Sequence, residues 1–440
     1  MPYWVNNMRK KIDRVKCFST QRLFGRYKFT MSPVLVITAL LGSPLSEAEE
    51  ITLSSAIQRA VDKNPSLQVY RYRSLELEGL ATMENLSPGL ELSADIENFA
   101  GSGEFSGTDN AEMTLAISSV IELGGKRQQR GVVVSQRQKM MRADREVAAL
   151  DLIGEVTRRY VETIASQQRL ELAVRARELA ITTLNSVEKR VEAGATSKVE
   201  LLRAQAASYQ AEMVVSIEQD QLAKKRLALS VLWGEDKPSF LKVSGNLFDL
   251  GVAGDFEALY SRAIKNPSIQ LFANEERLRD AELRLAKAGS SSDINWSVGA
   301  RHFKETDDTA VVASVSVPLF TSKRNAGSSQ AALAAKNKVA IERDLALLKL
   351  RASLFSAFTN REQSLNYYSL LKERIIPSLQ EALVETQSGY ERGRFSYQEW
   401  LAARQELLES EYALITVAEQ AQVHRAEIER LTAEPLSLGE

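Results

Sequence analysis

A short segment that occurs twice constrains the fold of this chain more than any other feature. Its first copy, RVEAGATSKVELL, covers residues 190–202, and its second copy, GYERGRFSYQEWL, covers residues 389–401. Both copies carry the pattern G-x-x-S-x-x-E between two long stretches of helix-forming sequence. Glycine supplies the left-handed backbone that ends a helix, and a serine three residues later can cap the next one. Each copy therefore predicts the tight tip of a long helical hairpin.

The pattern predicts the same three roles in each tip. The glycine ends the incoming helix, the serine caps the outgoing helix, and the glutamate stands where its carboxylate completes a capping box. Any two helical hairpins could share this pattern, but both copies lie inside a much longer duplication. The residues are Gly194, Ser197 and Glu200 in the first tip, and Gly393, Ser396 and Glu399 in the second.

The duplication extends over most of the 440 residues. Residues 49–254 form the predicted first repeat, residues 255–432 the second, and residues 433–440 a C-terminal tail. Each repeat predicts a short helix, a helix that begins at an Asn-Pro-Ser motif, a β-hairpin, a very long helix, the tip and a returning helix. The chain is poor in glycine and proline, a composition that favours long helices over a compact globular domain.

Long helices dominate the prediction. The helical hairpins cover residues 125–232 and 326–431, the second with a kink at Pro377. The first long helix would have about 65 residues and a length of roughly 100 Å. The helices predicted at 197–232 and 267–288 together match that length, so we expect them to stack end to end beside it.

A belt is predicted part-way along the helices, where residues 233–254 form a mixed connection that contains glycine and proline. Heptad spacing of Leu201, Val215, Leu222 and Leu229 indicates lateral packing of neighbouring helices.

Each repeat also contains two stretches of strict alternation between apolar and polar residues, which predict the β-hairpins 90–123 and 293–320. An isolated hairpin is marginal in water, but strands of about ten residues with one apolar face can cross a membrane. Open sheet edges are not tolerated in lipid, and four strands cannot close a barrel alone. The alternation therefore predicts that several chains share one membrane barrel.

Residues 1–48 predict a secretory signal peptide with a long basic n-region. A short apolar run, residues 34–41, follows the basic residues, and Ser46-Glu47-Ala48 provides a cleavage site. The run is too short to cross a bilayer as a helix. Met31 is an alternative start, and a disordered basic tail is the alternative interpretation.

The residues that the chain lacks exclude several functions. Lys and Arg number 56 against 57 Asp and Glu, so nucleic-acid binding has no electrostatic support. Cys17 is the only cysteine, which excludes a disulfide framework and cysteine-ligated zinc. His302 and His424 have no metal-ligand partner at useful spacing. Phosphate-loop and nucleophile-elbow motifs are missing as well, so we predict neither an enzyme nor a cofactor.

Taken in order, the motifs resemble those of the TolC-type outer-membrane efflux protein family. The resemblance covers residues 50–432. It rests on NPSL and NPSI at 64 and 266, SSVIELGGKR at 118–127, VPLF at 317–320 and the two tips. The ELGGKR strand exit is most similar to the subgroup that serves cobalt-zinc-cadmium-type cation efflux.

The resemblance implies a mainly α-helical fold with a small β part. In a homotrimer, long helical hairpins would form an α-barrel tunnel in the periplasm. Four membrane strands from each protomer would share a twelve-stranded β-barrel in the lipid of the outer membrane. The tips, shaped by Gly194, Ser197, Gly393 and Ser396, would dock a periplasmic adaptor (membrane fusion) protein. The adaptor would couple them to an inner-membrane pump of the resistance-nodulation-division type.

The resemblance also points to a pore constriction. Family members often carry an acidic residue six positions after the second-tip glycine, which here is Glu399, and Glu200 is its counterpart in the first tip. Ala402 stands where some members have a second acidic residue, so a double carboxylate ring is not expected. Three like charges near one axis would repel each other and could bind cations. A purely capping role for Glu399 is the alternative.

We therefore predict an outer-membrane exit duct of a tripartite efflux system that passively conducts heavy-metal cations. A duct for drug efflux or type I protein secretion is the alternative within the same fold. A secreted coiled-coil scaffold is the alternative from another class, and the alternation at 90–97 and 294–301 argues against it.

Overall fold

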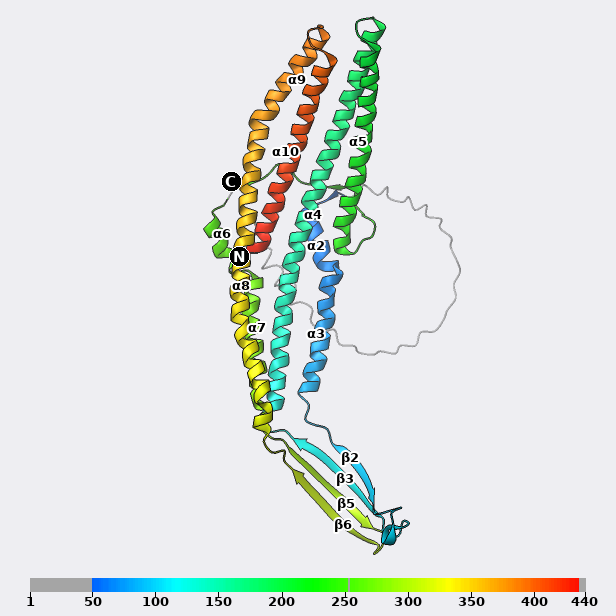
Figure 1. Ribbon diagram of the computed structural model, residues 1–440, viewed down its shortest axis with the longest axis vertical. Helices are drawn as coiled ribbons and strands as arrows, with labels where there is room; N and C mark the ends of the chain where they lie inside the picture. The colour runs from blue at the N-terminus through cyan, green and yellow to red at the C-terminus, as the bar shows by residue number, and fades with distance from the viewer. Residues whose placement is uncertain (1–49, 252–253, 435–440) are drawn as a thin grey trace, which may run out of the picture.

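The computed structural model describes residues 50–251 and 254–434. The predicted signal peptide and most of the predicted tail lie outside the described residues. The molecule is elongated, with its helices along the long axis, a small sheet at one end and both helical tips at the other (Figure 1). In the part of the chain that the structure describes, no helix combines the length and apolar character needed to cross a membrane.

The order of elements is the same in the two halves of the chain. The first half contains β1 (Glu50–Ile51), α2 (Leu53–Lys63), α3 (Pro65–Glu84), β2 (Glu91–Glu97), a 3-10 turn (Gly103–Phe105), β3 (Glu112–Ile121), α4 (Lys126–Glu192) and α5 (Lys198–Ser230). A 3-10 turn (Val231–Trp233) and β4 (Lys242–Val243) follow. The second half contains α6 (Phe256–Ala263), α7 (Pro267–Ala288), β5 (Ile294–Phe303), β6 (Asp308–Ser316), α8 (Thr321–Leu370), a π-helical turn (Leu371–Ile375), α9 (Ile376–Glu391) and α10 (Tyr397–Thr432).

The second long helix differs from its prediction in two places. It begins at Thr321 rather than near residue 326, because Phe320, with a φ of 62°, turns the chain directly from the strand exit into the helix. The irregularity expected at Pro377 is a π-helical turn that immediately precedes α9. Proline has no amide hydrogen to continue the helical ladder, and the wider turn lies where that ladder is interrupted.

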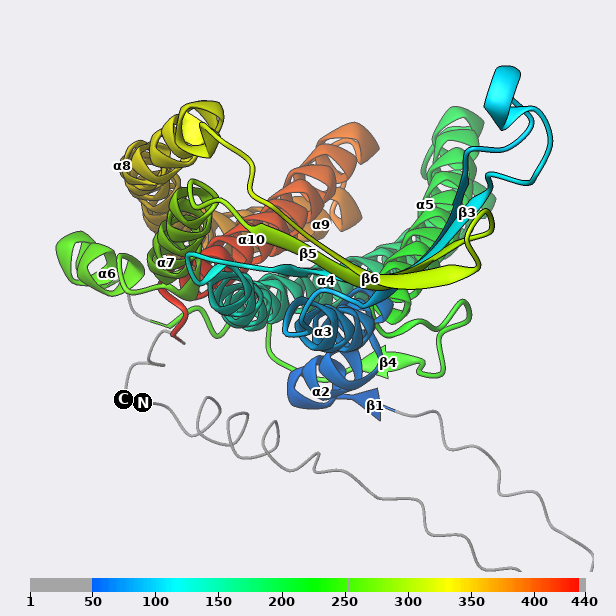
Figure 2. The same ribbon diagram turned by 90° about the horizontal axis from the view of Figure 1, so that it is seen from below.

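The helices form a single curved layer in two tiers. In the tier next to the sheet their order is α3, α4, α7 and α8, and in the tier next to the tips it is α5, α4, α10 and α9. Only α4 and the α8–α9 pair run through both tiers (Figure 1). Viewed along the long axis, α2 and β4 lie close together on the convex face of this layer, and α6 lies apart from them, beside α8 (Figure 2).

The stacking of the shorter helices corrects our prediction. We expected the helix at 197–232 to stack on the helix at 267–288, but α5 stacks on the α2–α3 junction and α10 stacks on α7. The Asn64 side-chain amide donates to the carbonyl oxygen of Leu232 at 2.7 Å. The Asn266 amide donates to the carbonyl oxygens of Arg430 and Leu431, both at 2.9 Å. Both asparagines also cap their own helices, so the repeated Asn-Pro-Ser motif joins one tier to the next.

One antiparallel sheet contains all four predicted strands in the order β2-β3-β5-β6. The two repeats meet between β3 and β5, where Leu115 lies opposite Ala300 and Ile117 opposite Val298. The short parallel pair β1–β4 was not predicted, and its two-residue strands are too brief for any alternation to mark them.

The sheet has one apolar and one polar face, as the alternation predicts. Opposite residues are apolar on one face, for example Leu92 with Ile117 and Trp296 with Val315. On the polar face, Arg301 forms ion pairs with Glu97 at 3.0 Å and with Glu112 at 2.9 Å.

The described part of the connection, residues 233–251, folds back against α4 and forms the belt. The hydroxyl of buried Tyr160 donates to the carbonyl oxygen of Ile51 at 2.8 Å. The Gln167 side chain bonds to both the N–H and the carbonyl of Val243. Trp233 and Phe240 are fully buried in the same core. Thus the largest apolar core lies at mid-length, where the two tiers meet.

Candidate functional site at the helical tips

The backbone of both tips follows one plan. Gly194 and Gly393 have φ values of 70° and 75°, the left-handed conformation in which glycine carries no steric penalty. The Gly194 N–H donates to the Val191 carbonyl at 2.9 Å, and the Ala195 N–H donates to the Arg190 carbonyl at 2.7 Å. The second tip repeats both bonds, from Gly393 and Arg394 to the carbonyl oxygens of Tyr390 and Gly389. Both hairpins therefore end in Schellman motifs.

The second tip contains the predicted capping box. The Glu399 N–H donates to Ser396 Oγ at 3.3 Å, and the Ser396 N–H donates to the Glu399 carboxylate at 2.7 Å. The Ser396 hydroxyl adds a bond of 2.8 Å to the same carboxylate oxygen. These donors, the backbone N–H first, hold the pKa of Glu399 below its ordinary value.

The capping box predicted for the first tip is wrong in its reciprocal half. Ser197 Oγ accepts from the Glu200 N–H at 3.4 Å, but the Glu200 carboxylate does not return to the cap. It instead accepts from the Thr196 hydroxyl and, at 3.3 Å, from the hydroxyl of Tyr390 on α9. The Tyr390 hydroxyl of the other hairpin competes with the cap for the Glu200 carboxylate. Glu200 therefore contacts the second hairpin instead of closing the cap of its own helix.

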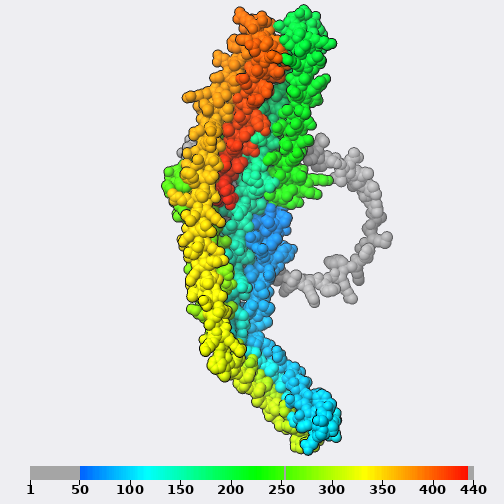
Figure 3. All heavy atoms as spheres, in the orientation of Figure 1, coloured from blue at the N-terminus to red at the C-terminus, as the bar shows by residue number. Residues whose placement is uncertain are grey.

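The two tips lie side by side and share a small core (Figure 3). Val187 and Ala204 from the first hairpin pack against Tyr390, Tyr397 and Trp400 from the second. The Tyr390 and Trp400 rings stack with centroids 5.1 Å apart. Burial of this aromatic cluster joins the ends of the hairpins as one unit.

Polar contacts around Tyr390 reinforce the joint. Arg190 Nη1 donates to the Glu391 carbonyl oxygen at 3.0 Å, and its guanidinium lies 4.7 Å above the Tyr390 ring centroid. Burial, and then the negative charge of Glu200, raise the pKa of the Tyr390 hydroxyl. The phenol therefore remains a proton donor to Glu200 at neutral pH.

The structure brings the six predicted tip residues to one end of the molecule, but only Glu200 takes part in the contact between hairpins. Our sequence reasoning missed Arg190, Tyr390 and Trp400. The signal for them was present, because Arg190 and Tyr390 stand within the two aligned segments at positions where the copies differ.

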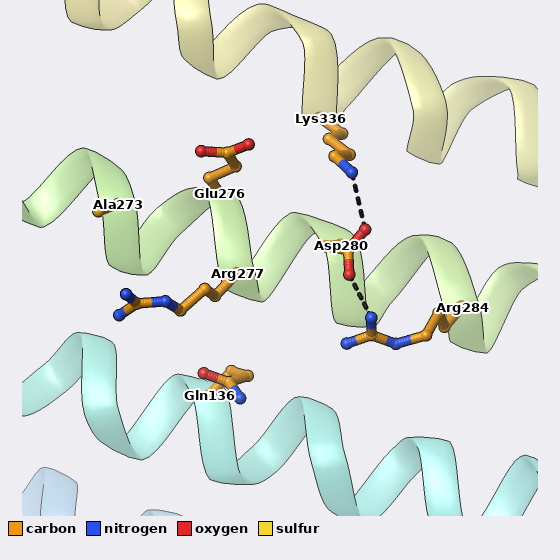
Figure 4. Close-up of a pocket in the computed structure, with 7 residues that line it drawn as sticks. All are labelled: Gln136, Ala273, Glu276, Arg277, Asp280, Arg284 and Lys336. Atoms are coloured by element: carbon orange, nitrogen blue, oxygen red, sulfur yellow. Dashed lines mark hydrogen bonds and ion pairs between the residues drawn. The ribbon is translucent and has the colours of Figure 1, made fainter.

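A hollow on the surface lies far from the tips, across α7 between α4 and α8 (Figure 4). It is open, has a volume of about 520 Å³, and is lined mainly by charged side chains. Asp280 at its centre pairs with Lys336 at 2.8 Å and with Arg284. The pKa of Asp280 is lowered, mainly by the hydrogen bond that its carboxylate accepts from Lys336. The Asp280–Lys336 ion pair joins α7 to α8, and the Asp280–Arg284 pair lies within α7.

Metal-ligating side chains do not gather anywhere in the described chain: no group of three or more His, Cys, Asp or Glu is placed to hold an ion. His302 lies in β5 with its Nε2 atom 3.7 Å from Asp307. His424 lies in α10, where burial lowers its pKa.

Long helical hairpins in one curved layer, with a small two-faced sheet at the end opposite the tips, define a class of elongated channel-type proteins. The family model described as "Outer membrane efflux protein" matches residues 56–235 and 259–434. The chain therefore belongs to the outer membrane efflux protein family. As such it is located in the outer membrane, with its long helices in the periplasm.

Individual proteins agree with this assignment. The chain is 25% identical over 388 residues to the cobalt-zinc-cadmium resistance protein CzcC of Cupriavidus metallidurans, covering 88% of this chain and 91% of that protein. Its fold is similar to that of CusC, whose structures describe transmembrane channel formation, with a TM-score of 0.73, 16% identity and coverage of 87% and 92%. A membrane protein from Pseudomonas aeruginosa has a TM-score of 0.71, 18% identity and coverage of 86% and 93%.

Proposed function

We propose that three copies of this chain form the exit duct of a tripartite efflux system, which passively conducts heavy-metal cations to the exterior. In this proposal the curved helical layers close into a periplasmic tunnel and the sheets close into a membrane barrel. The tips dock a periplasmic adaptor that is coupled to an inner-membrane pump.

The observation that carries the proposal is where exposed apolar side chains lie. The helices at the two edges of the layer are α3 and α8 in one tier, and α5 and α9 in the other. In the described chain, large exposed apolar residues are numerous on α3, α5 and α8. The fourth edge helix, α9, carries one, Val384, and α4 and α10 also carry one each, Ile181 and Tyr412, while α7 carries none. The residues on the three apolar edge helices include Val69, Tyr72, Leu75 and Met83 on α3, Tyr209, Met213, Val214 and Ile217 on α5, and Leu333, Ile341, Leu345 and Leu348 on α8.

Both edges of the layer are apolar in the tier next to the sheet, on α3 and α8, and one edge is apolar in the tier next to the tips, on α5. These edges favour closure by rotation, because the edge of one copy then covers the opposite edge of the next. The same closure would pair strand β2 of one copy with β6 of the next, and so remove the open edges of the sheet. The apolar face, with Leu92 at 77% and Val311 at 81% exposure, would then meet lipid.

Metal cations are proposed as cargo from two observations. The relative from Cupriavidus metallidurans carries cobalt, zinc and cadmium in its name, and the ELGGKR strand exit is present here at 122–127. Since the described chain holds no metal cluster, the duct would conduct these ions rather than store them. The passive role agrees with a family of efflux proteins rather than enzymes.

The duct is tested by purifying the full mature chain in detergent and recording single channels in planar bilayers. We expect a heat-modifiable trimer with steady conductance, and recovery as a water-soluble periplasmic monomer would overturn the proposal. Ile217→Asp on α5 should prevent trimer formation, whereas Glu218→Asp beside it should not.

The cargo is tested separately in a deletion strain exposed to zinc, cobalt, cadmium, copper and a set of dyes. We expect lost metal tolerance with unchanged dye tolerance. The reverse result would assign the duct to drug efflux.

A further inference from the structure

Arg404 is a buried cation in the seam between α10 and α4, close to the shared core of the tips. Its exposed fraction is 8%. Its Nη1 atom donates to the hydroxyl of Thr183 on α4 at the long distance of 3.4 Å. Among the described residues it has no ion pair and no other hydrogen bond, and burial lowers its pKa. A guanidinium removed from water without a carboxylate is costly, so its presence calls for an explanation.

Other arginines of the same seam are paired. Arg169 on α4 pairs with Glu419 on α10, and Arg430 on α10 pairs with Asp151 on α4 at 2.7 Å. Among the described residues, the seam thus supplies a carboxylate to each of these two arginines, which lie further from the tips, but none to Arg404.

A second buried polar group lies beside Arg404 without a partner. Tyr397, two helical turns earlier, is 1% exposed, and its hydroxyl makes no hydrogen bond among the described residues. Burial raises the pKa of this phenol, Arg404 lowers it, Glu200 raises it and Arg203 lowers it, so Arg404 is the charge that acts most strongly on the hydroxyl. A guanidinium and a phenol hydroxyl that are both buried and have no carboxylate partner among the described residues fit an anionic group better than a neutral one.

Helical geometry shows which side of the layer Arg404 faces. Gln422 follows it by about five turns and therefore lies on the same face of α10. The Gln422 amide donates to the carbonyl oxygens of Leu247 and Asp249 at 3.3 and 2.7 Å, and these belong to the belt. The belt covers the convex face of the layer, so Arg404 faces that side too.

We propose that Arg404 receives an aspartate or glutamate carboxylate from a partner protein that docks on the convex face of the α4–α10 seam. The inference rests on the proposed function, in which the docking partner is the periplasmic adaptor. A neighbouring copy cannot supply the group, because copies would meet at the edge helices α5 and α9 and leave this seam inside each protomer. The buried guanidinium of Arg404, which has no carboxylate partner among the described residues, selects an acidic residue as the occupant.

The first test separates a docking residue from a structural one by a matched pair of variants in the full trimer. Arg404→Met keeps the volume but removes the unpaired charge, so the melting temperature should stay unchanged or rise. Arg361→Met is the comparison, because Arg361 is also buried and donates to the Leu250 carbonyl of the belt at 2.8 Å. That variant should melt lower than the wild type. Equal losses in both variants would make Arg404 a structural residue and overturn the inference.

The second test measures binding of the purified adaptor to the detergent-solubilised trimer. Loss of a hydrogen bond to a charged group predicts binding about tenfold to a hundredfold weaker for Arg404→Met, with Arg404→Lys in between. Equal binding by wild type and Arg404→Met would overturn the inference and leave the duct proposal intact. A wild-type trimer that conducts but does not bind the adaptor would contradict the docking part of the proposed function itself.

Discussion

The two tips have the same backbone and use the same glutamate differently. Each ends in a Schellman motif and each outgoing helix has a serine cap. In the second tip the carboxylate of Glu399 closes its own cap, whereas in the first tip the carboxylate of Glu200 reaches the hydroxyl of Tyr390 on the other hairpin. Duplication thus preserved the turn, and one side chain changed from a local to a long-range contact.

This difference makes the first tip the one that holds the hairpins together. Glu200 and Arg190 both belong to the first hairpin and both contact the end of α9. Glu399 is exposed, and among the described residues its carboxylate hydrogen-bonds only to Ser396. Changes at the first tip should therefore alter how the hairpins pack, and changes at Glu399 should alter only the start of α10.

The largest effect is expected in the apolar core that both tips share, because a change there should alter both tips together. Trp400 is 5% exposed, so Trp400→Ala should cost about 3–5 kcal/mol of local stability. Hydrogen exchange at α5 and α9 should then rise together. Tyr412→Ala, a half-exposed aromatic on the same helix, is the control and should cost less than about 1 kcal/mol. Faster exchange in α9 alone would show that the tips are independent.

A smaller effect is expected when the cross-hairpin bond alone is removed. Tyr390→Phe keeps the ring next to Trp400 and Arg190 but removes the hydrogen bond from Tyr390 to Glu200, which then keeps only the Thr196 hydroxyl among the described residues, at a cost of about 1–2 kcal/mol. The hairpins should separate more easily, which planar-bilayer recording would detect as higher conductance. Tyr397→Phe is the matched control, since its hydroxyl has no partner to lose in the described chain. Equal conductance changes in the two variants would contradict the role given to Glu200.

Local patterns made much of the fold predictable. The tips were predictable from Gly194 and Gly393, because few other residues accept a positive φ. The alternation of apolar and polar residues predicted all four strands of the main sheet. The stacking partners were not predictable from helix lengths, since several combinations add up to the length of α4. The Asn64 and Asn266 amides decide the pairing through hydrogen bonds to helix ends far along the chain.

The candidate site was predictable in its backbone and not in its contacts. A capping box requires residues three positions apart, which sequence shows directly for Ser396 and Glu399. The competing hydroxyl of Tyr390 comes from the other hairpin, so nothing local to Glu200 indicates it. The unpaired state of Arg404 is likewise a property of the packed seam.

The serine caps should differ slightly in strength. Ser396 takes part in a reciprocal box, whereas the Ser197 cap is a single bond of 3.4 Å. Ser396→Ala should therefore cost about 1 kcal/mol and Ser197→Ala about 0.5 kcal/mol. Hydrogen exchange at the first turns of α10 and α5 would measure both. A larger loss at Ser197 would show that the first cap also depends on the bond to Tyr390.

The smallest effect, the acid response of the second tip, separates the two roles considered for Glu399. Hydrogen bonds from Ser396 lower the pKa of this carboxylate below its ordinary 4.5, so its contribution is present above that value and lost as the pH falls through the lowered pKa. Hydrogen exchange at the start of α10 should rise only in acid below about pH 4.5, and Glu399→Gln should remove this dependence.

A ring of three such carboxylates around one axis would raise the pKa of Glu399 instead, because each negative charge disfavours ionisation of the next. In the assembled protein, a midpoint below 4.5 therefore identifies a helix cap, and a midpoint above it identifies a pore constriction.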